Sequence, residues 1–334
     1  MRQTTLKEVA QEAGVSIKTV SRVVNKDRGV SPTTAARVHQ VVMELGYQPN
    51  EVARSLRGKR SRTIGLVIAD SSNPFYAECA KAVEEISRKH GYMVILCASD
   101  ESEDIENEYV ELLSRRRVDG LLVVPAAKKG ETSYPQDRYK GIITVALDRP
   151  LDDVPASAVL VENLSGMHSA TTHLIQHHKH QNIAFVGGYE EVYTVRKRLE
   201  GYQEAIEKAG LEDIHRFGAV DVSSATMVTD ELLRLPEPPS AILAWNNLAL
   251  IGILKALSKH EVKIPDEVAV IGFDDFELAA LLYPRLTVVR QPTADMAREA
   301  AKLLFNLLDD SGEIEPQHIV LPTELVVRDS CGCR

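Results

Sequence analysis

The feature that most constrains the fold is a long alternation of apolar strands with amphipathic helices, which begins at residue 64. The apolar segments are continuous runs of Val, Ile and Leu, and helical periodicity follows many of them, as in 76–90 and 199–209. Such a pattern indicates buried parallel sheets with right-handed crossovers. Nine strands over about 270 residues fit two lobes better than one. The predicted strands are Ile64–Asp70, Tyr92–Ser99, Gly120–Ala126, Ile142–Asp148, Ala158–Glu162, Ile183–Gly188, Ala241–Asn246, Val268–Phe273 and Leu286–Arg290.

Residues 1–46 follow a different pattern, that of three short helices. A helix-turn-helix needs a small residue where its helices touch, a glycine in the turn, and an apolar residue that anchors the second helix. Ala10, Gly14 and Val20 supply these at the expected offsets. Ser31-Pro32 then begins a third helix, with proline in its first turn. The segment is predicted to be an all-α helix-turn-helix head.

Charge is divided unevenly between this head and the rest of the chain. The net charge is -9, yet residues 1–62 contain 12 Lys and Arg against 5 Asp and Glu, a net +7. The remaining residues therefore carry -16. A basic head on an acidic body predicts that a polyanion binds the head alone. Residues 47–62 form a basic connector with too few apolar residues to fold by itself, so we expect it to order only against a partner.

The second helix of the head, 17–24, is the predicted DNA reader. Lys18 and Arg22 can reach guanine O6 and N7, and Ile17 can meet a thymine methyl group. Polar residues around the helix suit phosphate contacts that fix its register on the duplex. A surface motif that merely packs three helices is the alternative. The predicted DNA contacts of the head are Ser16, Ile17, Lys18, Thr19, Ser21, Arg22, Asn25, Ser31 and Thr34.

These segments resemble the LacI/GalR family of lactose- and galactose-repressor-like regulators, and the resemblance runs nearly the whole chain. It implies that the connector forms a hinge helix, which pairs with its dimer mate in the minor groove, with Leu56 wedged into the central base step. An apolar wedge unstacks a step and kinks the duplex; a buried linker residue is the alternative for Leu56. Asn50 and Ala53 join it as predicted contacts. The resemblance is carried by Leu6-Lys7-Glu8-Val9-Ala10, Gly14-Val15-Ser16, Thr19-Val20-Ser21-Arg22-Val23-Val24-Asn25, Leu45-Gly46-Tyr47, Pro49-Asn50 and Ala53-Arg54-Ser55-Leu56.

For the body, the resemblance implies a two-lobed α/β architecture like that of periplasmic binding proteins, with parallel sheets. Ligands of such sheets bind beyond the carboxyl ends of the strands. Arg198 matches an arginine that hydrogen-bonds sugar hydroxyls in the family. A guanidinium suits a polyol or a carboxylate as its partner. Structural alternatives are a helix-starting aromatic staple for Phe75, helix caps for Asn246 and Asp274, and a core position for Trp245. The predicted ligand-binding residues are Phe75, Asp148, Arg198, Trp245, Asn246 and Asp274.

Departures from the family pattern leave the ligand's identity open. Asn247 stands where the family usually has Asp, Glu162-Asn163 stands where Asp-Asn is common, and 177–180 replaces a Leu-Gly-His turn with His-His-Lys-His. A longer acid and a lost carboxylate change the size and polarity of a pocket. The acidic run 100–108 is predicted to be a solvated loop and helix start.

Four cysteines are too few for a disulfide scaffold. Cys331-Gly332-Cys333 could bind a metal or form a strained disulfide. No other Cys or His cluster in the sequence completes a metal set, so we predict a solvated tail and no metal site.

Enzyme and transport functions find little support. The sequence has no G-x-x-x-x-G-K, G-x-S-x-G or H-E-x-x-H motif, so we expect no enzyme activity and no cofactor. It has no apolar leader and no stretch long enough to cross a bilayer, which predicts a cytoplasmic location without membrane contact. The domains are predicted at 1–46 (head), 47–62 (hinge and linker), 63–330 (body; lobe 1 about 63–160 and 290–325, lobe 2 about 161–289) and 331–334 (tail).

Together these features predict a sequence-specific DNA-binding repressor. Its homodimer would bind a pseudo-palindromic operator, and a small ligand, a sugar or sugar derivative, would modulate that affinity allosterically. A corepressor-dependent regulator, an activator that responds to a non-sugar metabolite, and a non-specific DNA binder remain alternatives.

Overall fold

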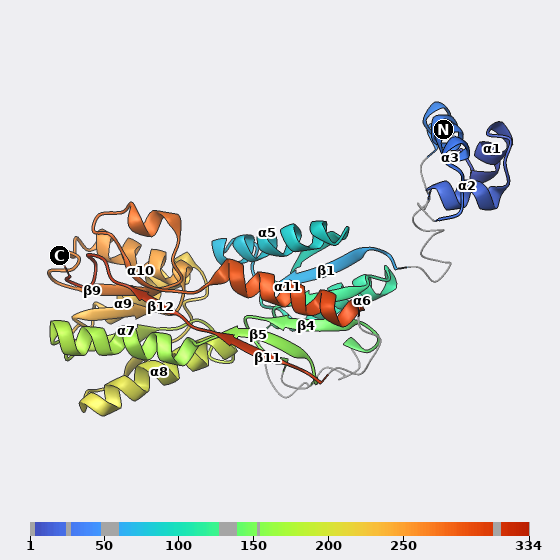
Figure 1. Cartoon of the computed structure of the whole chain (residues 1–334). Helices are drawn as coiled ribbons and strands as arrows, with labels where there is room; N and C mark the ends of the chain where they lie inside the picture. Colours follow the sequence, from blue (N-terminus) through green and yellow to red (C-terminus); the bar gives the residue numbers. More distant parts are fainter. Residues whose placement is uncertain are drawn as a thin grey trace. The chain divides into compact units, whose positions relative to one another are not determined.

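The computed structural model describes residues 4–24, 28–47, 60–126, 139–151, 154–309 and 315–333. The chain divides into two compact units, Met1–Ser61 and Arg62–Arg334 (Figure 1). Among the described residues, no helix combines the length and apolar character needed to span a bilayer.

The first unit contains three helices, α1 (Leu6–Glu12), α2 (Ile17–Val24) and α3 (Pro32–Glu44). Thr5 and Glu8 form a reciprocal capping box at the start of α1. Gly14 lies between α1 and α2 with φ +61°, a backbone conformation that glycine adopts without steric cost. The predicted helix-turn-helix is confirmed. Its core consists of Val9, Ala10, Ala13, Val20, Val23, Val38 and Val41.

The second unit is built on two six-stranded sheets. The first has the order β11-β5-β4-β3-β1-β2, and all its strand pairs are parallel. Helices α5 (Pro74–Lys89) and α11 (Thr293–Asp309) share one hydrophobic cluster with this sheet, and α6 (Glu103–Arg115) belongs to another. The strands are β1 (Thr63–Ile68), β2 (Met93–Ala98), β3 (Gly120–Val123), β4 (Ile143–Leu147), β5 (Ser157–Val161) and β11 (His318–Leu321).

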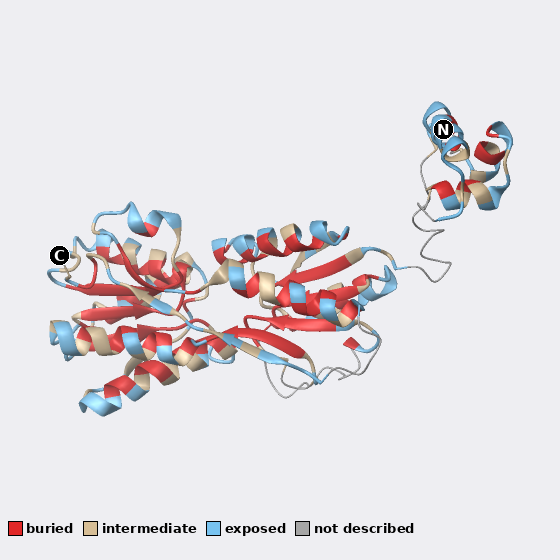
Figure 2. Ribbon diagram, in the orientation of Figure 1, coloured by how far each residue is buried: buried red, intermediate tan, exposed pale blue. Residues whose placement is uncertain are grey.

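The second sheet has the order β12-β10-β9-β8-β6-β7, in which only the β10–β12 pair is antiparallel. Helices α7 (Asn163–His178), α8 (Tyr193–Ala209), α9 (Val222–Leu232), α10 (Asn247–Lys259) and η2 (Glu277–Ala280) accompany it. Central strands of both sheets are buried, which explains their continuous apolar sequences (Figure 2). The strands are β6 (Ile183–Val186), β7 (Ile214–Arg216), β8 (Ala241–Ala244), β9 (Ala269–Phe273), β10 (Thr287–Arg290) and β12 (Glu324–Val326).

The sequence analysis did not predict three short strands, β7, β11 and β12. Each lies at the edge of its sheet and is only partly buried, so its sequence lacks the continuous apolar run of a central strand. The second lobe receives β12, which begins inside the 290–325 segment that we assigned to the first lobe.

The chain passes between the two sheets three times: after β5, after β10, and between β11 and β12. Two of these connections are tied together, because Glu162 donates its backbone N–H to the Leu321 carbonyl at 2.9 Å, and the Thr323 hydroxyl donates to the Glu162 carbonyl at 3.3 Å. A two-lobed body joined by short neighbouring segments is suited to hinge motion.

The prediction of a solvated tail was wrong at Cys331, which is buried, whereas Gly332 is exposed and Cys333 is half-buried. Ser330 and Cys331 are fully buried against the second sheet, where the Val270 N–H donates to the Ser330 carbonyl at 2.8 Å. Ser330 Oγ also donates to the Val270 carbonyl at 2.6 Å. The tail continues the packing of the second lobe because its polar groups find backbone partners there.

Candidate functional site

The exposed face of α2 carries the side chains predicted to read DNA. Ile17 is 49% exposed, and Lys18 and Arg22 are exposed beside it, whereas Val20 and Val23 point into the core of the head. Ser21 and Thr19 are half-buried. The exposed face of α2 therefore presents Ile17, Lys18 and Arg22, the side chains that the sequence assigned to base contacts, to the surroundings.

Two predicted DNA contacts, Ser16 and Ser31, also cap helices. Ser16 Oγ accepts the Thr19 N–H at 3.1 Å at the start of α2, and Ser31 Oγ accepts the Thr34 N–H at 3.2 Å at the start of α3. Helix N-termini bind anions readily, so these positions suit contacts with phosphate. The remaining predicted contacts, Asn25, Asn50, Ala53 and Leu56, lie outside the described residues.

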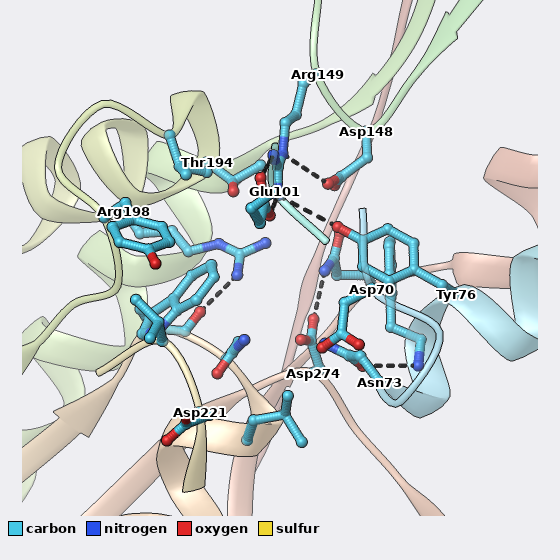
Figure 3. A pocket seen from close by; sticks show the side chains of 18 of the residues that line it. Asp70, Asn73, Tyr76, Glu101, Asp148, Arg149, Thr194, Arg198, Asp221 and Asp274 are labelled. Atoms are coloured by element: carbon cyan, nitrogen blue, oxygen red, sulfur yellow. Dashed lines mark hydrogen bonds and ion pairs between the residues drawn. The ribbon is translucent and has the colours of Figure 1, made fainter. Parts of the chain in front are cut away.

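A cavity of about 290 Å³ opens between the two lobes of the body. Residues that directly follow strands β1, β2 and β4 line it from the first lobe, and residues that follow β8, β9 and β10 line it from the second. This is the edge at which open parallel sheets bind ligands. Figure 3 shows Arg198 reaching into the cavity opposite Tyr76 and Asp148. All six predicted residues line it: Phe75, Asp148, Arg198, Trp245, Asn246 and Asp274.

Arg198 lines the cavity from the second lobe and is only 2% exposed. Its Nε donates to Asn163 Oδ1 at 2.8 Å, its Nη1 donates to the Trp245 carbonyl, and its guanidinium lies 3.7 Å from the centre of the Phe273 ring. Its hydrogen bonds to the described residues use Nε and Nη1, so Nη2 remains for a ligand. None of these acceptors carries a formal charge. Among the described residues Arg198 forms no ion pair, although the charges of Asp274 and Asp148 act on it from a longer distance.

Two carboxylates face the cavity from opposite lobes. Burial raises the pKa of Asp148 to about 6, although Arg149 and Arg198 nearby lower it. Burial also raises the pKa of Asp274, which accepts a hydrogen bond from the Gln291 amide. The Oδ1 atom of Asp148 is buried and has no hydrogen-bond partner among the described residues. A buried acceptor of this kind calls for a donor, which a bound ligand can supply.

Three of the predicted residues line the cavity and also have the structural roles that we considered as alternatives. Asn246 Oδ1 caps α10 by accepting the Ala249 N–H at 2.8 Å. Trp245 belongs to the core of the second lobe, and its Nε1 donates to the Ala219 carbonyl at 2.9 Å. Phe75 lies in the first turn of α5 and is 7% exposed. Each side chain therefore forms a fixed wall.

A charged network in the first lobe was missed by sequence reasoning. Arg149 is 3% exposed and forms a fork with Glu101, at 2.7 Å from Nη1 to Oε2 and 2.6 Å from Nη2 to Oε1. Its Nη2 also donates to the Tyr76 hydroxyl at 3.3 Å. All three residues line the cavity. The available signal was Arg149 itself, since an arginine directly after a buried strand requires an acidic partner.

The interpretation of residues 100–108 as a solvated segment was wrong for three of its acids, one of which is the buried Glu103. Glu101 pairs with Arg149, and Glu106 is fully buried. Glu106 accepts the Ala126 N–H and the Tyr139 hydroxyl, both at 2.6 Å. Acidic residues that follow a buried strand can accept hydrogen bonds from buried donors. The composition of the segment alone does not show this role.

Asn247, one of the departures from the family pattern, makes a contact across the cleft. Its Nδ2 donates to Asn73 Oδ1 at 3.0 Å, and that oxygen also accepts the Phe75 N–H at 2.9 Å at the start of α5. Because Asn73 Oδ1 is committed to capping, its partner in the second lobe must be a donor. An amide at 247 meets this requirement and a carboxylate does not.

Comparisons with known proteins agree with both units. The model of bacterial regulatory proteins of the lacI family matches residues 5–50, and the model of a periplasmic binding protein-like domain matches 171–331. The HTH-type transcriptional repressor PurR of Vibrio campbellii is 33% identical over 329 residues, which are 98% of each chain. The ribose operon repressor of Escherichia coli is 34% identical over 329 residues, 98% of this chain and 99% of the relative.

Solved structures give the same result. The lac repressor dimer bound to operator and the anti-inducer ONPF superposes with a TM-score of 0.87 at 25% identity and covers 99% of both chains. The complex of the transcriptional regulator CelR with cellobiose has a TM-score of 0.73 at 31% identity and covers 98% of this chain and all of that one. With relatives at this identity along nearly its whole length, the chain belongs to the lacI family of bacterial regulatory proteins and is a DNA-binding transcriptional regulator.

Proposed function

We propose that this regulator is a repressor that binds a pseudo-palindromic operator as a homodimer in the cytoplasm. A sugar that binds in the cavity between its lobes changes its affinity for that operator. The observation that carries this proposal is Arg198, a buried cation that forms no ion pair among the described residues and shares the cavity with two carboxylates. The similarity to a repressor dimer bound to operator supports the DNA part.

The chemistry of the cavity favours a polyol. A sugar hydroxyl both donates and accepts, so it can satisfy Arg198 from one side and Asp148 or Asp274 from the other. Trp245 and Phe75 supply flat apolar walls for the carbon face of a sugar ring. The volume, about 290 Å³, lies at the lower end of ligand pockets. This size favours a small sugar, in keeping with a relative that is a repressor of a ribose operon.

A ligand in this position is able to act as an allosteric effector because it bridges two lobes. Asp148 belongs to the first lobe, whereas Arg198 and Asp274 belong to the second. A ligand that joins them shifts the angle between the lobes about the three connections described above. β1 begins directly after the connector 47–62, so lobe motion moves the point from which the connector starts. The coupling must be reciprocal: operator DNA changes ligand affinity by the same factor.

The test is fluorescence-anisotropy binding of the full chain to operator selected from random DNA, at two salt concentrations, with and without each member of a sugar panel. We expect a palindromic consensus and an affinity that one sugar class changes at least about tenfold, a coupling of roughly 1.4 kcal/mol. An increase in affinity rather than a decrease would identify a corepressor.

Two results would refute the proposal in different ways. A steep salt dependence with no consensus would leave a non-specific binder. A consensus that no sugar affects, but that an aromatic or acidic metabolite does, would keep the regulator and reject the sugar.

A further inference from the structure

Two histidines of α7 and the two cysteines of the tail come together at the end of the second lobe that carries the C-terminal residues. The ligating atoms of His173, His178, Cys331 and Cys333 all lie within 4.8 Å of one another. Cys333 Sγ lies 3.3 Å from His178 Nε2 and 3.6 Å from His173 Nε2. The two imidazole rings are 5.1 Å apart, centre to centre. Residues 155 and 160 positions apart in the sequence thus converge on one point.

We propose that these four side chains form a tetrahedral Cys₂His₂ site for one Zn²⁺ ion. Zinc–sulfur bonds of about 2.3 Å and zinc–nitrogen bonds of about 2.1 Å place sulfur and nitrogen about 3.6 Å apart at the tetrahedral angle. The observed sulfur–nitrogen distances of 3.3 and 3.6 Å match that spacing. Two soft thiolates with two imidazoles form a set that selects zinc over calcium or magnesium. Four protein ligands leave no open position, so the site is structural.

The backbone around the cysteines is shaped to bring both toward the histidines. Gly332 has φ +103°, and a Cβ at this position would lie 3.0 Å from His178 Nδ1. Glycine therefore permits both the turn between the two cysteines and the close approach of the imidazole. The turn is fixed from outside by Asp329, whose carboxylate accepts two hydrogen bonds from the Arg285 guanidinium, each 2.8 Å long, and a third from the Arg285 backbone N–H at 3.3 Å.

A hydrogen bond orients the sulfur of Cys331. Cys331 is fully buried, and the Thr287 hydroxyl donates to its sulfur at 3.2 Å. A donor aimed at a ligating sulfur orients it and disperses its negative charge, as outer-shell partners do in metal sites. Thr287 Oγ1 in turn accepts the Arg328 N–H at 2.9 Å, which fixes the hydroxyl in place.

The site would staple the tail to α7. α7 precedes β6 and the tail follows β12, so the ion would close a loop of more than 150 residues. Metal clips across long loops constrain the unfolded chain most strongly, and binding to the folded state alone stabilises it by mass action. This proposal does not depend on the ligand in the cavity.

The experiment uses the untagged full chain in reducing buffer, dialysed against a chelator and then titrated with Co²⁺ alone and afterwards with Zn²⁺. We expect one equivalent of cobalt, visible bands of the intensity typical of a four-coordinate ion, and thiolate-to-cobalt charge transfer in the near ultraviolet. Zinc should abolish these bands stoichiometrically. The zinc-loaded chain should also unfold at a higher temperature than the chelated chain.

Matched variants separate this site from adventitious surface histidines. His178→Gln and Cys333→Ser, both at partly exposed positions, should lose the cobalt bands. The controls are His177→Gln, at the exposed neighbouring position, and Cys97→Ser, in the first lobe, which should each keep one equivalent. Circular dichroism checks that each variant folds. If a variant does not fold, the cobalt titration of the wild-type chain still tests the site.

Three outcomes would overturn the proposal. The first is that the wild-type chain gives only the weak visible bands of a six-coordinate cobalt ion. The second is that the His177→Gln control loses as much metal as the ligand variants. The third is that a Cys331–Cys333 disulfide persists in reducing buffer and no metal binds.

Discussion

The two walls of the cavity differ in how they satisfy their charges. In the first lobe, Arg149 is neutralised by Glu101 within the same wall, at distances of 2.6 and 2.7 Å. In the second lobe, Arg198 is held by an amide oxygen, a carbonyl and an aromatic ring, none of which carries a formal charge. Two buried arginines of one cavity therefore differ in their surroundings. Arg149 maintains the wall, whereas in the function that we propose the charge of Arg198 serves a ligand.

Arg149→Gln should have the largest effect, and on stability rather than on ligand specificity. It leaves Glu101 partly buried without its partner, and breaking a buried pair from one side costs about 3–5 kcal/mol. Urea denaturation of the body measures this loss. Arg88→Gln removes an exposed pair with Glu84 and should change the unfolding free energy by about 1 kcal/mol or less. Equal losses in the two variants would mean that the fork contributes nothing special.

Arg198→Gln should mainly weaken ligand binding. A hydrogen bond to a charged group contributes about 1.5–3 kcal/mol, so the dissociation constant should rise roughly tenfold to a hundredfold. Isothermal titration calorimetry with the effector found in the sugar panel measures it. Arg196→Gln, at an exposed position two residues earlier on α8, serves as the control and should leave affinity unchanged. Comparable ligand affinity in Arg198→Gln and wild type would remove the distinction between the two walls.

The carboxylate of Asp148 should make ligand affinity depend on pH. Its pKa is raised to about 6 by burial, and the charged form is the one that accepts from a ligand hydroxyl at both oxygens. Affinity should therefore fall as pH drops through 6, by up to about tenfold per pH unit. Titrations between pH 5 and pH 8, roughly one unit below and two above that pKa, would show the step, and Asp148→Asn should remove it. A step that survives in Asp148→Asn would assign the titration to another group.

The same carboxylate should affect the ligand-free protein with the opposite trend. Its pKa in the folded state lies above the unfolded value of about 3.9. The native state therefore holds more protons than the unfolded state between these values, and this group's contribution to stability declines as pH rises from about 4 to 6.

Asn247→Asp should have the smallest effect, on the balance between lobe arrangements. The carboxylate would face Asn73 Oδ1, which is committed to capping α5, and the bond across the cleft would be lost. A neutral hydrogen bond contributes about 0.5–1.5 kcal/mol, so an effector that closes the lobes should bind roughly two to ten times more weakly. Small-angle scattering should show a more open body. Tighter binding in Asn247→Asp would mean that the effector favours separated lobes.

Much of the molecule followed from sequence patterns that act locally. Buried parallel strands must be apolar on both faces, so the nine predicted strands are present. Polar residues placed just after such strands gather at one edge by topology alone, which is why six predicted residues line one cavity. Turn and cap residues such as Gly14 and Ser16 indicated the helix-turn-helix because turns and helix caps are also set by the local sequence.

Tertiary structure alone decided which distant residues become partners. The pairing of Arg149 with Glu101 and of Asn73 with Asn247 depends on how strands and lobes pack, and no spacing in the chain encodes it. The edge strands β7, β11 and β12 gain their identity from a neighbour's hydrogen bonds rather than from their own apolar content. In sequence, Cys331 and Cys333 lacked any matching histidine nearby. Folding brings His173 and His178 to them because α7 and the tail pack on the same sheet, and contacts between segments so far apart are fixed by the global fold.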